Sequence, residues 1–210
     1  DAAICESDNF YQISDASITH TDYTSLEWTT SGTGFFDDPF SLNPIYNPSP
    51  ADINASVVTL TLDVTTAGGC VINPDSLILT ITKEATSNAG PATDAICEGD
   101  VYTLNGVVDN SISEEWTTSG DGVFGNNEDP NTTYTPGPID ITNGLVTLSL
   151  QAVGDAPCNN LAVSSIDLLI NGEITVFAGD DATICESPSF YQLSAAAITP
   201  PNYTSFEWIT

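Results

Sequence analysis

Basic residues are almost absent from this 210-residue chain, which has one lysine, one histidine and no arginine against 29 acidic residues. The net charge of −28 would be repelled by phosphate backbones and by anionic lipid headgroups. No basic patch or basic helix offsets that repulsion. The composition therefore excludes nucleic-acid binding and membrane insertion, and it favours solubility and repulsion between neighbouring molecules.

Catalytic groups are equally scarce. The histidine, His20, aligns with Pro200 in a later repeat, so an imidazole is not a feature of the repeat. The sequence contains no GxSxG, P-loop or HExxH motif. Its carboxylates could pair for glycoside hydrolysis, but acids repeated along a chain are more typical of a solvated surface. Lys83 aligns with Gly172, which excludes a lysine–asparagine crosslink in every repeat. We predict that the chain is not an enzyme.

Long apolar runs and helical periodicity are missing as well. No stretch approaches the roughly 18 apolar residues of a membrane span, and Asp1 opens directly into repeat sequence without an apolar signal core. We therefore expect an interior piece of a longer exported protein, located outside the cell at its surface. Threonine, valine and isoleucine are abundant, which favours strands and argues against helices longer than a turn or two.

What the chain does contain is a repeat. The words Glu27–Gly32 and Glu115–Gly120 are identical, and a third copy begins at Glu207. Residues 1–30 match residues 181–210 at 19 of 30 positions without a gap. A period of about 88 residues suits a small domain. It is seen in five recurring pairs: Trp28 and Trp116, Tyr46 and Tyr134, Asp52 and Asp140, Leu60 and Leu148, and Cys70 and Cys158.

This period predicts three domains. They are residues 1–88, with a truncated first strand, residues 89–178, and residues 179–210 as the N-terminal fragment of a third. The linkers expected between them, Thr86–Pro91 and Phe177–Asp180, are short. Short linkers leave little freedom between neighbours, so we expect a rod-like array.

Each repeat shows the pattern of a β-sandwich. Val58, Leu60 and Leu62 alternate with polar residues, as expected of a strand with one buried face. Trp28 shares a strand face with Leu26 and should point into the core. About seven short strands in roughly 90 residues, with a tryptophan between two cysteines, predict an all-β protein of tandem immunoglobulin-like β-sandwich domains. The predicted core tryptophans are Trp28, Trp116 and Trp208.

The cysteines recur at matching places: Cys5 and Cys70, Cys97 and Cys158, and Cys185 alone in the partial third copy. No neighbouring cysteine or histidine completes a zinc motif, so disulfides in an oxidising compartment are favoured over metal. Small buried apolar side chains are the alternative. The number of cysteines, two in each complete repeat, favours pairing within each repeat. Sandwich topology instead brings the first turn of one domain close to the last hairpin of the next, which would pair Cys5 with Cys158. Both pairings stay open, with the first preferred.

Several of these words resemble the repeated Ig-like and PKD-like domains of giant surface adhesins of gliding, Bacteroidota-type bacteria. The words are Ala178-Gly-x-x-Ala-x-Ile-Cys-Glu186, Glu-Trp-Thr-Thr-Ser-Gly-x-Gly, Tyr134-Thr-Pro136 and Val58–Leu62. The resemblance covers essentially the whole chain. It implies export by a type IX secretion route, display outside the cell, and service as a stalk or filament in surface attachment and gliding motility. We expect the main partners of each repeat to be the neighbouring repeats of the same chain.

Acidic loops raise the question of calcium, because several hard oxygen donors lie in short segments. The candidate ligands are Asp37, Asp38, Asp121, Asn126, Glu128 and Asp129. Their spacing fits no EF-hand, and Asp37 and Asp38 align with Gly125 and Asn126, so the set is not preserved between repeats. Solvated loop acids are the favoured interpretation, and no cofactor other than calcium is considered.

Two functions remain. One is a structural spacer that holds an adhesive end away from the cell. The other is a glycan-binding module, in which an exposed aromatic ring stacks on a sugar and loop acids or calcium hold its hydroxyls, with surface polysaccharide or another surface protein as partner. The spacer is favoured because the repeated tryptophans read as core residues.

Overall fold

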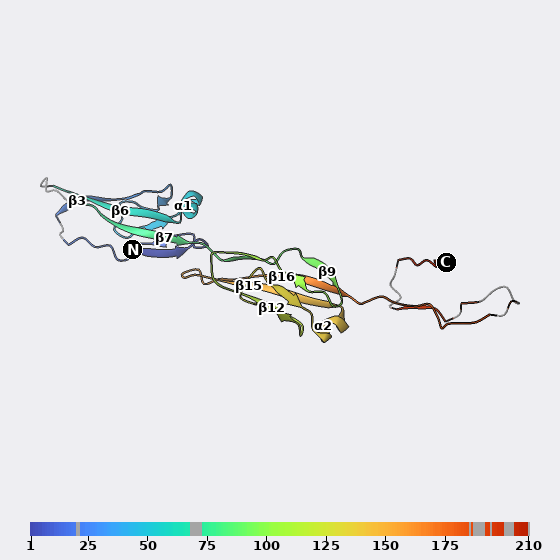
Figure 1. The fold of residues 1–210 in the computed structure, drawn as a ribbon. Coiled ribbons are helices and arrows are strands. Elements are labelled where there is room, and N and C mark those ends of the chain that lie inside the picture. The colour runs from blue at the N-terminus through green and yellow to red at the C-terminus, as the bar shows by residue number, and fades with distance from the viewer. Residues whose placement is uncertain are drawn as a thin grey trace.

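The computed structural model describes residues 1–19, 22–67, 73–184, 186, 192–193, 195–199 and 204–209. Strands follow one another along most of these residues, and the two helices found among them have six residues each. Figure 1 shows a first unit, a second unit and the C-terminal residues one after another along the molecule. We define the first unit as the elements from β1 to β7 and the second as those from β8 to β16.

The first unit has two sheets. The larger has the strand order β1-β7-β6-β3, with β1 parallel to β7 and the other pairs antiparallel. The smaller has the order β2-β5-β4. The strands are β1 (Ala2–Cys5), β2 (Tyr11–Gln12), β3 (Tyr23–Thr30), β4 (Phe35–Phe36), β5 (Ile45–Asn47), β6 (Val57–Thr66) and β7 (Asp75–Thr82).

The second unit repeats this arrangement and adds a strand pair. Its sheets have the orders β12-β15-β16-β9 and β10-β14-β13, and β8 pairs with β11. The strands are β8 (Thr86–Asn88), β9 (Thr93–Cys97), β10 (Tyr102–Thr103), β11 (Val107–Asp109), β12 (Ser111–Thr118), β13 (Val123–Phe124), β14 (Thr133–Thr135), β15 (Leu145–Gly154) and β16 (Leu161–Asn171).

The cores follow from alternation along the strands. In β6, Val58 and Leu60 are 2% and 0% exposed, and the alternate residues of the strand are exposed or half-buried. Trp28 and Trp116 are 5% and 1% exposed, as the strand pattern predicts. Each unit has its own cluster of buried residues, built from the same repeat positions. The all-β sandwich predicted from the sequence is therefore confirmed.

Two short helices precede the longest strands. In α1 (Pro50–Ala55) the cap residue Ser49 and the third residue Asp52 form a capping box, and Ser56 ends the helix with a φ of 63°. In α2 (Pro138–Asn143) Gly144 ends the helix with a φ of 69°. Glycine is well suited to that left-handed conformation. Both helices stay within the turn or two that the sequence allows.

The predicted linkers are partly strands. Thr86–Pro91 begins with β8, which pairs with β11 and belongs to the second unit. Phe177–Asp180 begins inside β17 (Thr175–Phe177), which pairs with β18 (Ala197–Thr199). The short polar segment Thr86–Asn88 shows no apolar alternation that would predict a strand. Inside the fold the Ser87 hydroxyl instead bonds the Leu150 carbonyl and the Ser164 hydroxyl. The domain boundaries remain predictions.

Trp208 is not a core residue in this structure. It is 52% exposed, whereas its counterparts in the two units are buried. Those counterparts pack against strands that follow them in the sequence, β6 and β7 or β15 and β16. Among the described residues, no strand after β18 lies over Trp208 in this way. The prediction that Trp208 is a core residue is therefore wrong for this structure.

Candidate functional site at the junction of the two units

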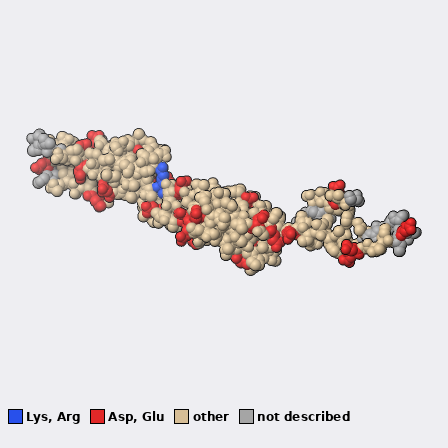
Figure 2. Space-filling model, viewed as in Figure 1, with Lys and Arg blue, Asp and Glu red and all other residues tan. Residues whose placement is uncertain are grey.

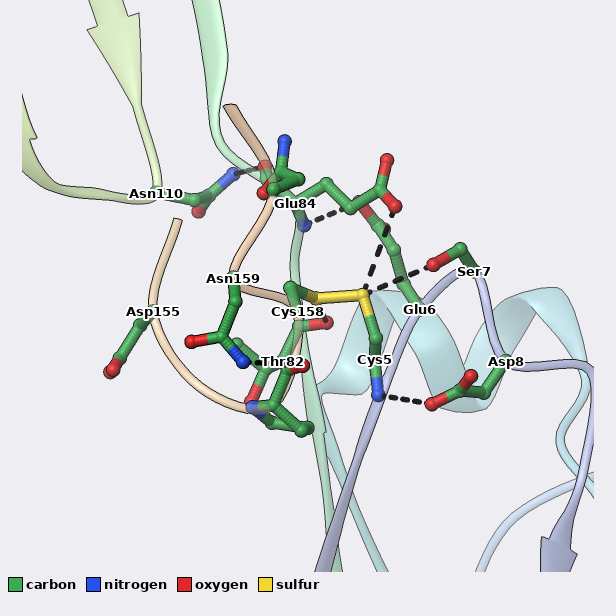
Figure 3. The surroundings of a disulfide bond; sticks show 12 residues. Cys5, Glu6, Ser7, Asp8, Thr82, Glu84, Asn110, Asp155, Cys158 and Asn159 are labelled. Atoms are coloured by element: carbon green, nitrogen blue, oxygen red, sulfur yellow. Dashed lines mark hydrogen bonds between the residues drawn. A yellow bond between two sulfur atoms is a disulfide. The ribbon is translucent and has the colours of Figure 1, made fainter. Parts of the chain in front are cut away.

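A disulfide joins the first unit to the second. Cys5 at the end of β1 is bonded to Cys158 in the turn between β15 and β16, with 4.7 Å between their Cα atoms. The two cysteines are 153 residues apart in the sequence. Figure 3 shows the bond among residues of both units. The preferred pairings within each repeat, Cys5 with Cys70 and Cys97 with Cys158, are therefore wrong.

Strand direction explains the correction. β1 runs parallel to β7, so Cys5 lies opposite Thr82, where the chain leaves the first unit. The other end of β7, at Asp75, is seven residues away, or about 23 Å along a strand. A disulfide needs Cα atoms within about 7 Å. The turn between β15 and β16 of the second unit meets that requirement, and the distant end of the first unit does not.

Hydrogen bonds across the junction fix the connecting residues. Asn160 receives a hydrogen bond from the Ala85 N–H at its Oδ1, and its Nδ2 donates to the Ala85 carbonyl, both at 2.9 Å. Asn110 Nδ2 donates to the Glu84 carbonyl at 3.2 Å. Ala85 is 3% exposed. The backbone between the units is thus paired on both sides rather than free in solvent.

The Cys5 side of the junction is held by the residues that follow it. The Glu6 N–H donates to the Thr82 carbonyl, and Glu6 Oε1 accepts from the Glu84 N–H, both at 2.8 Å. The Cys5 N–H donates to Asp8 Oδ2 at 2.8 Å, and the Ser7 hydroxyl donates to the Cys5 sulfur at 3.2 Å (Figure 3). These bonds orient Cys5 towards the second unit.

The second unit carries the same arrangement around Cys97. The Cys97 N–H donates to Asp100 Oδ2, and the Glu98 N–H donates to the Asn171 carbonyl at 2.8 Å. Glu98 Oε2 accepts from the Glu173 N–H at 3.4 Å. Cys97 itself is a free, exposed thiol. The surroundings of Cys5 therefore recur around Cys97 without the bond. Cys70 and Cys185 lie outside the described residues.

A buried tyrosine–aspartate pair lies in each unit. In the first unit, Asp52 is 2% exposed and accepts from the N–H groups of Thr33, Gly34 and Ser49 at 2.8 to 2.9 Å. The Tyr46 hydroxyl also donates to it, at 2.9 Å. The bonds join a turn, a strand and the start of α1. The sequence did show this tyrosine and aspartate recurring, but their role emerges only from these contacts.

The second unit builds the same pair. Asp140 is 1% exposed and accepts from the N–H groups of Asp121, Gly122 and Gly137 at 3.0 to 3.2 Å, and from the Tyr134 hydroxyl at 2.6 Å. A buried carboxylate with several donors is stabilised in its charged form. Because the pair is enclosed in both units, it is a structural element of the repeat.

The pKa values follow from these bonds. Burial by itself would raise the pKa of Asp52 and of Asp140, but the hydrogen bonds to each carboxylate together outweigh it and lower both pKa values. Burial and then the hydrogen bond to Asp140 raise the pKa of Tyr134 to about 12. Each pair is therefore a carboxylate with a neutral phenol at physiological pH.

The calcium candidates of the first unit support their own loop. Asp37 Oδ1 accepts from the N–H groups of Asp38 and Ile45, and Asp38 Oδ1 accepts from the Phe40 N–H. In the second unit Asp121 Oδ1 accepts from the N–H groups of Ile139 and Asp140. These carboxylates are used as turn and helix acceptors.

The remaining candidates lie in one exposed loop. Asn126 Oδ1 accepts from the Glu128 N–H, and Asp129 Oδ1 accepts from the Asn131 N–H. Within the residues that the structure describes, no three acidic, cysteine or histidine side chains converge as metal ligands. The six candidates are not brought together, and a calcium site stays an untested prediction.

Acidic residues are distributed over the face of the molecule seen in Figure 2, and basic atoms are visible only where the two units meet. Among the described residues, no helix has the length and apolar character needed to cross a bilayer.

No protein-family profile and no curated protein matches this sequence. Solved structures do. The chain is similar to human CDH23 EC21–23, with a TM-score of 0.50 and 13% identity over 83% of this chain and 72% of that one. It also matches human Protocadherin-24 EC1-2 (TM-score 0.43, 12% identity, 71% and 82% covered) and the human Desmocollin-1 ectodomain (0.40, 14%, 80% and 38%).

At these identities the likeness shows the fold alone. It confirms an immunoglobulin-like β-sandwich and is silent on the resemblance to adhesins of gliding bacteria, which remains a prediction.

Proposed function

We propose that this chain is a structural segment of a large extracellular adhesin, in which β-sandwich repeats form a rod-like array stapled by a disulfide at each junction. The observation that carries the proposal is the Cys5–Cys158 bond between the units. Disulfides persist in oxidising compartments outside the cytosol. The partners of each repeat are then its neighbours in the same chain.

The disulfide gives tension a covalent path that bypasses most of both units. Tension applied at the two ends of the chain enters through β1 to Cys5, crosses to Cys158, and leaves through β16 and the residues after it. The 153-residue separation between the cysteines represents roughly 500 Å of extended chain. That length cannot be released while the bond is intact. Such a bypass suits a stalk that must keep its length under load.

The repetition of the Cys5 surroundings around Cys97 extends the proposal along the array. If the first cysteine of one repeat pairs with the second cysteine of the next, Cys97 is the half of a staple that joins the second repeat to the third. Surface attachment and gliding motility after type IX export, as the adhesin resemblance implies, are the setting in which we place this stalk.

The glycan-binding alternative is supported less well. Trp28 and Trp116 are enclosed in the cores and offer no ring face to a sugar. Trp208 is exposed, but its counterparts Trp28 and Trp116 are buried, so an exposed ring is not a feature of the repeat. We propose a non-enzymatic role, because His20 aligns with Pro200 and so does not recur in the repeat, and the recurring Asp52 and Asp140 are buried as structural acceptors.

Single-molecule pulling from both ends of the chain tests the function. We expect unfolding to release roughly 500 Å more contour length with reductant than without it, because reduction opens the bypass. The Cys97→Ser variant should behave as the native chain does, since Cys97 is free. Equal release in both conditions would contradict the proposed stalk.

Trypsin provides the control for the pairing itself. Lys83 is the single basic site, and it lies between the bonded cysteines. After denaturation with thiols blocked, residues 1–83 and 84–210 should stay linked until reductant is added. In Cys158→Ser they should separate without it. Separation of the native pieces without reductant would show that the two units are not bonded.

A further inference from the structure

A groove opens on the first unit beside the tryptophan of its core. It has a volume of about 330 Å³, and its walls include Ile13, Ser17, Trp28, Leu62, Asp75 and Leu77. Apolar side chains thus form the floor, and Asp75 lies at the rim. A groove of this kind on a sandwich needs an explanation, because the repeat should bury these positions.

In the second unit a strand fills the same place. The pairings Leu60 with Leu77 and Leu148 with Ile166 align the two sheets, so Leu150 and Ser164 are the counterparts of Leu62 and Asp75. Ser87 of β8 donates to the Leu150 carbonyl at 2.8 Å, and its hydroxyl lies 2.6 Å from that of Ser164. Strand β8 therefore covers the positions that form the groove in the first unit.

Burial differs accordingly at three matched positions beside the groove. Leu62 is 8% exposed and Leu150 0%, and Trp28 is 5% exposed and Trp116 1%. Leu77 is half-buried, whereas its counterpart Ile166 is 1% exposed. Ala89, directly after β8, is 2% exposed and belongs to the second core. The first unit lacks the cover that these residues supply.

An edge for a strand is present beside the groove. Strand β8 pairs with β11, and β17 pairs with β18. In the gap-free alignment of residues 1–30 with 181–210, β18 corresponds to residues 17–19. Residues 17–19 pair with no strand in the described part of the chain. An edge with unpaired backbone groups can accept another strand by β-augmentation.

We propose that the groove of the first unit is the docking site of an inter-repeat linker strand, which enters in line with β1 as β8 enters in line with β9. The occupant is an extended segment with the chemistry of Thr86–Ala89, antiparallel to residues 17–19. Its hydroxyl side chain donates to the Leu62 carbonyl and to Asp75, in the places of Leu150 and Ser164. Each linker then both joins two repeats and completes the sandwich of the second.

Charge supports an occupant of this type. Asp1, Asp15 and Asp75 all line the groove, so an acidic strand would meet repulsion. Thr86, Ser87 and Asn88 carry no charge and offer side-chain donors, and Ala89 is small enough to be buried. The groove therefore selects a neutral, hydroxyl-rich segment rather than an acidic one.

An in-line graft tests the proposal in the full chain. The sequence of residues 84–92 is joined before Asp1, which is the counterpart of Thr93, so the spacing of β8 and β9 is reproduced. We expect amide exchange of residues 17–19 to slow at least about 10-fold, because those amides become paired. The fluorescence of Trp28 should shift to shorter wavelength in a Trp116→Phe, Trp208→Phe background.

The matched control carries the same graft with Ser87→Pro and Asn88→Pro in the added segment. The two prolines remove backbone donors and are poorly tolerated in a paired strand, so this segment should not dock and exchange at residues 17–19 should stay unchanged. Exchange in the second unit is the internal reference for folding. Equal exchange in the two grafts would overturn the proposal. Protection that arises in the ungrafted chain at high protein concentration would make a second molecule the occupant and would also overturn it.

Discussion

The two complete units share a topology and a tyrosine–aspartate pair, yet they differ in how completely the same core positions are covered. Strand β8 contacts Leu150 and Ser164 in the second unit, whereas their counterparts Leu62 and Asp75 line a groove in the first. The enclosed pair around Asp52 and Asp140 is unaffected by this difference. Burial in this repeat is therefore of two kinds, one internal to the unit and one supplied by the connecting segment.

That distinction gives the junction a role in folding as well as in linkage. Ala85 and Ala89 are buried on either side of β8, so the connection contributes side chains to the second unit. The same connection is clamped to the first unit through Glu84 and the Cys5–Cys158 bond. A change in the junction should therefore destabilise the core of the second unit and leave the core of the first unit unchanged.

The largest effect is expected from the shared pair. Asp140→Ala removes the acceptor of three backbone N–H groups and of the Tyr134 hydroxyl. Leaving those buried donors unpaired should lower the free energy of unfolding of the second unit by about 3–5 kcal/mol. Asp52→Ala should cost the first unit a similar amount. Urea unfolding followed by peptide-resolved hydrogen exchange reports each unit separately.

Tyr134→Phe is the control for this comparison, because it removes only the hydroxyl that bonds Asp140 and Thr118 and keeps the ring. Its cost should be about 1–2 kcal/mol. Costs for the two aspartates that differ by more than about 2 kcal/mol would show that the pair is not equivalent in the two units.

A smaller effect is expected from pH. The pKa values of Asp52 and Asp140 are below 3.8 in the folded chain, so folding is favoured by the charged carboxylates. The contribution is complete above the pKa of the unfolded carboxyl, and it is lost as the pH falls from about 4 through the folded pKa values. Thermal melts at pH values between about 2 and 6 should show the unfolding temperatures of both units falling together as the pH is lowered.

Asp140→Asn should remove this acid dependence from the second unit and leave it in the first. If the acid dependence of the second unit persisted in that variant, other carboxylates would have to account for it.

The smallest effect is expected from Ser87→Ala, which should destabilise only the second unit. Ser87→Ala removes the hydroxyl that bonds the Leu150 carbonyl and Ser164. We expect a loss of about 1 kcal/mol in the second unit and none in the first, measured by the same exchange experiment. Ser149→Ala is the matched control, since its hydrogen bond to Ser165 is exposed and should matter little. A loss in the first unit would mean that β8 supports both cores.

Much of the fold could be predicted from the sequence because it depends on short-range patterns. Alternation along Val58, Leu60 and Leu62 identified β6, and the 88-residue recurrence identified its counterpart β15. The inward orientation of Trp28 followed from its strand neighbours. The strand β8 was missed because Thr86–Asn88 is polar and short, and its partners lie elsewhere in the sequence.

The candidate site divides in the same way. The sequence by itself determined the repeat, the sandwich, and the presence of cysteines suited to disulfides, since each depends on residue type and spacing. Tertiary structure alone decided that Cys5 pairs with Cys158, because pairing depends on which strand ends meet in space. It likewise decided that Trp208 is exposed and that a tyrosine and an aspartate form a buried pair. Burial and pairing depend on contacts between distant segments, and spacing along the chain does not encode those distances.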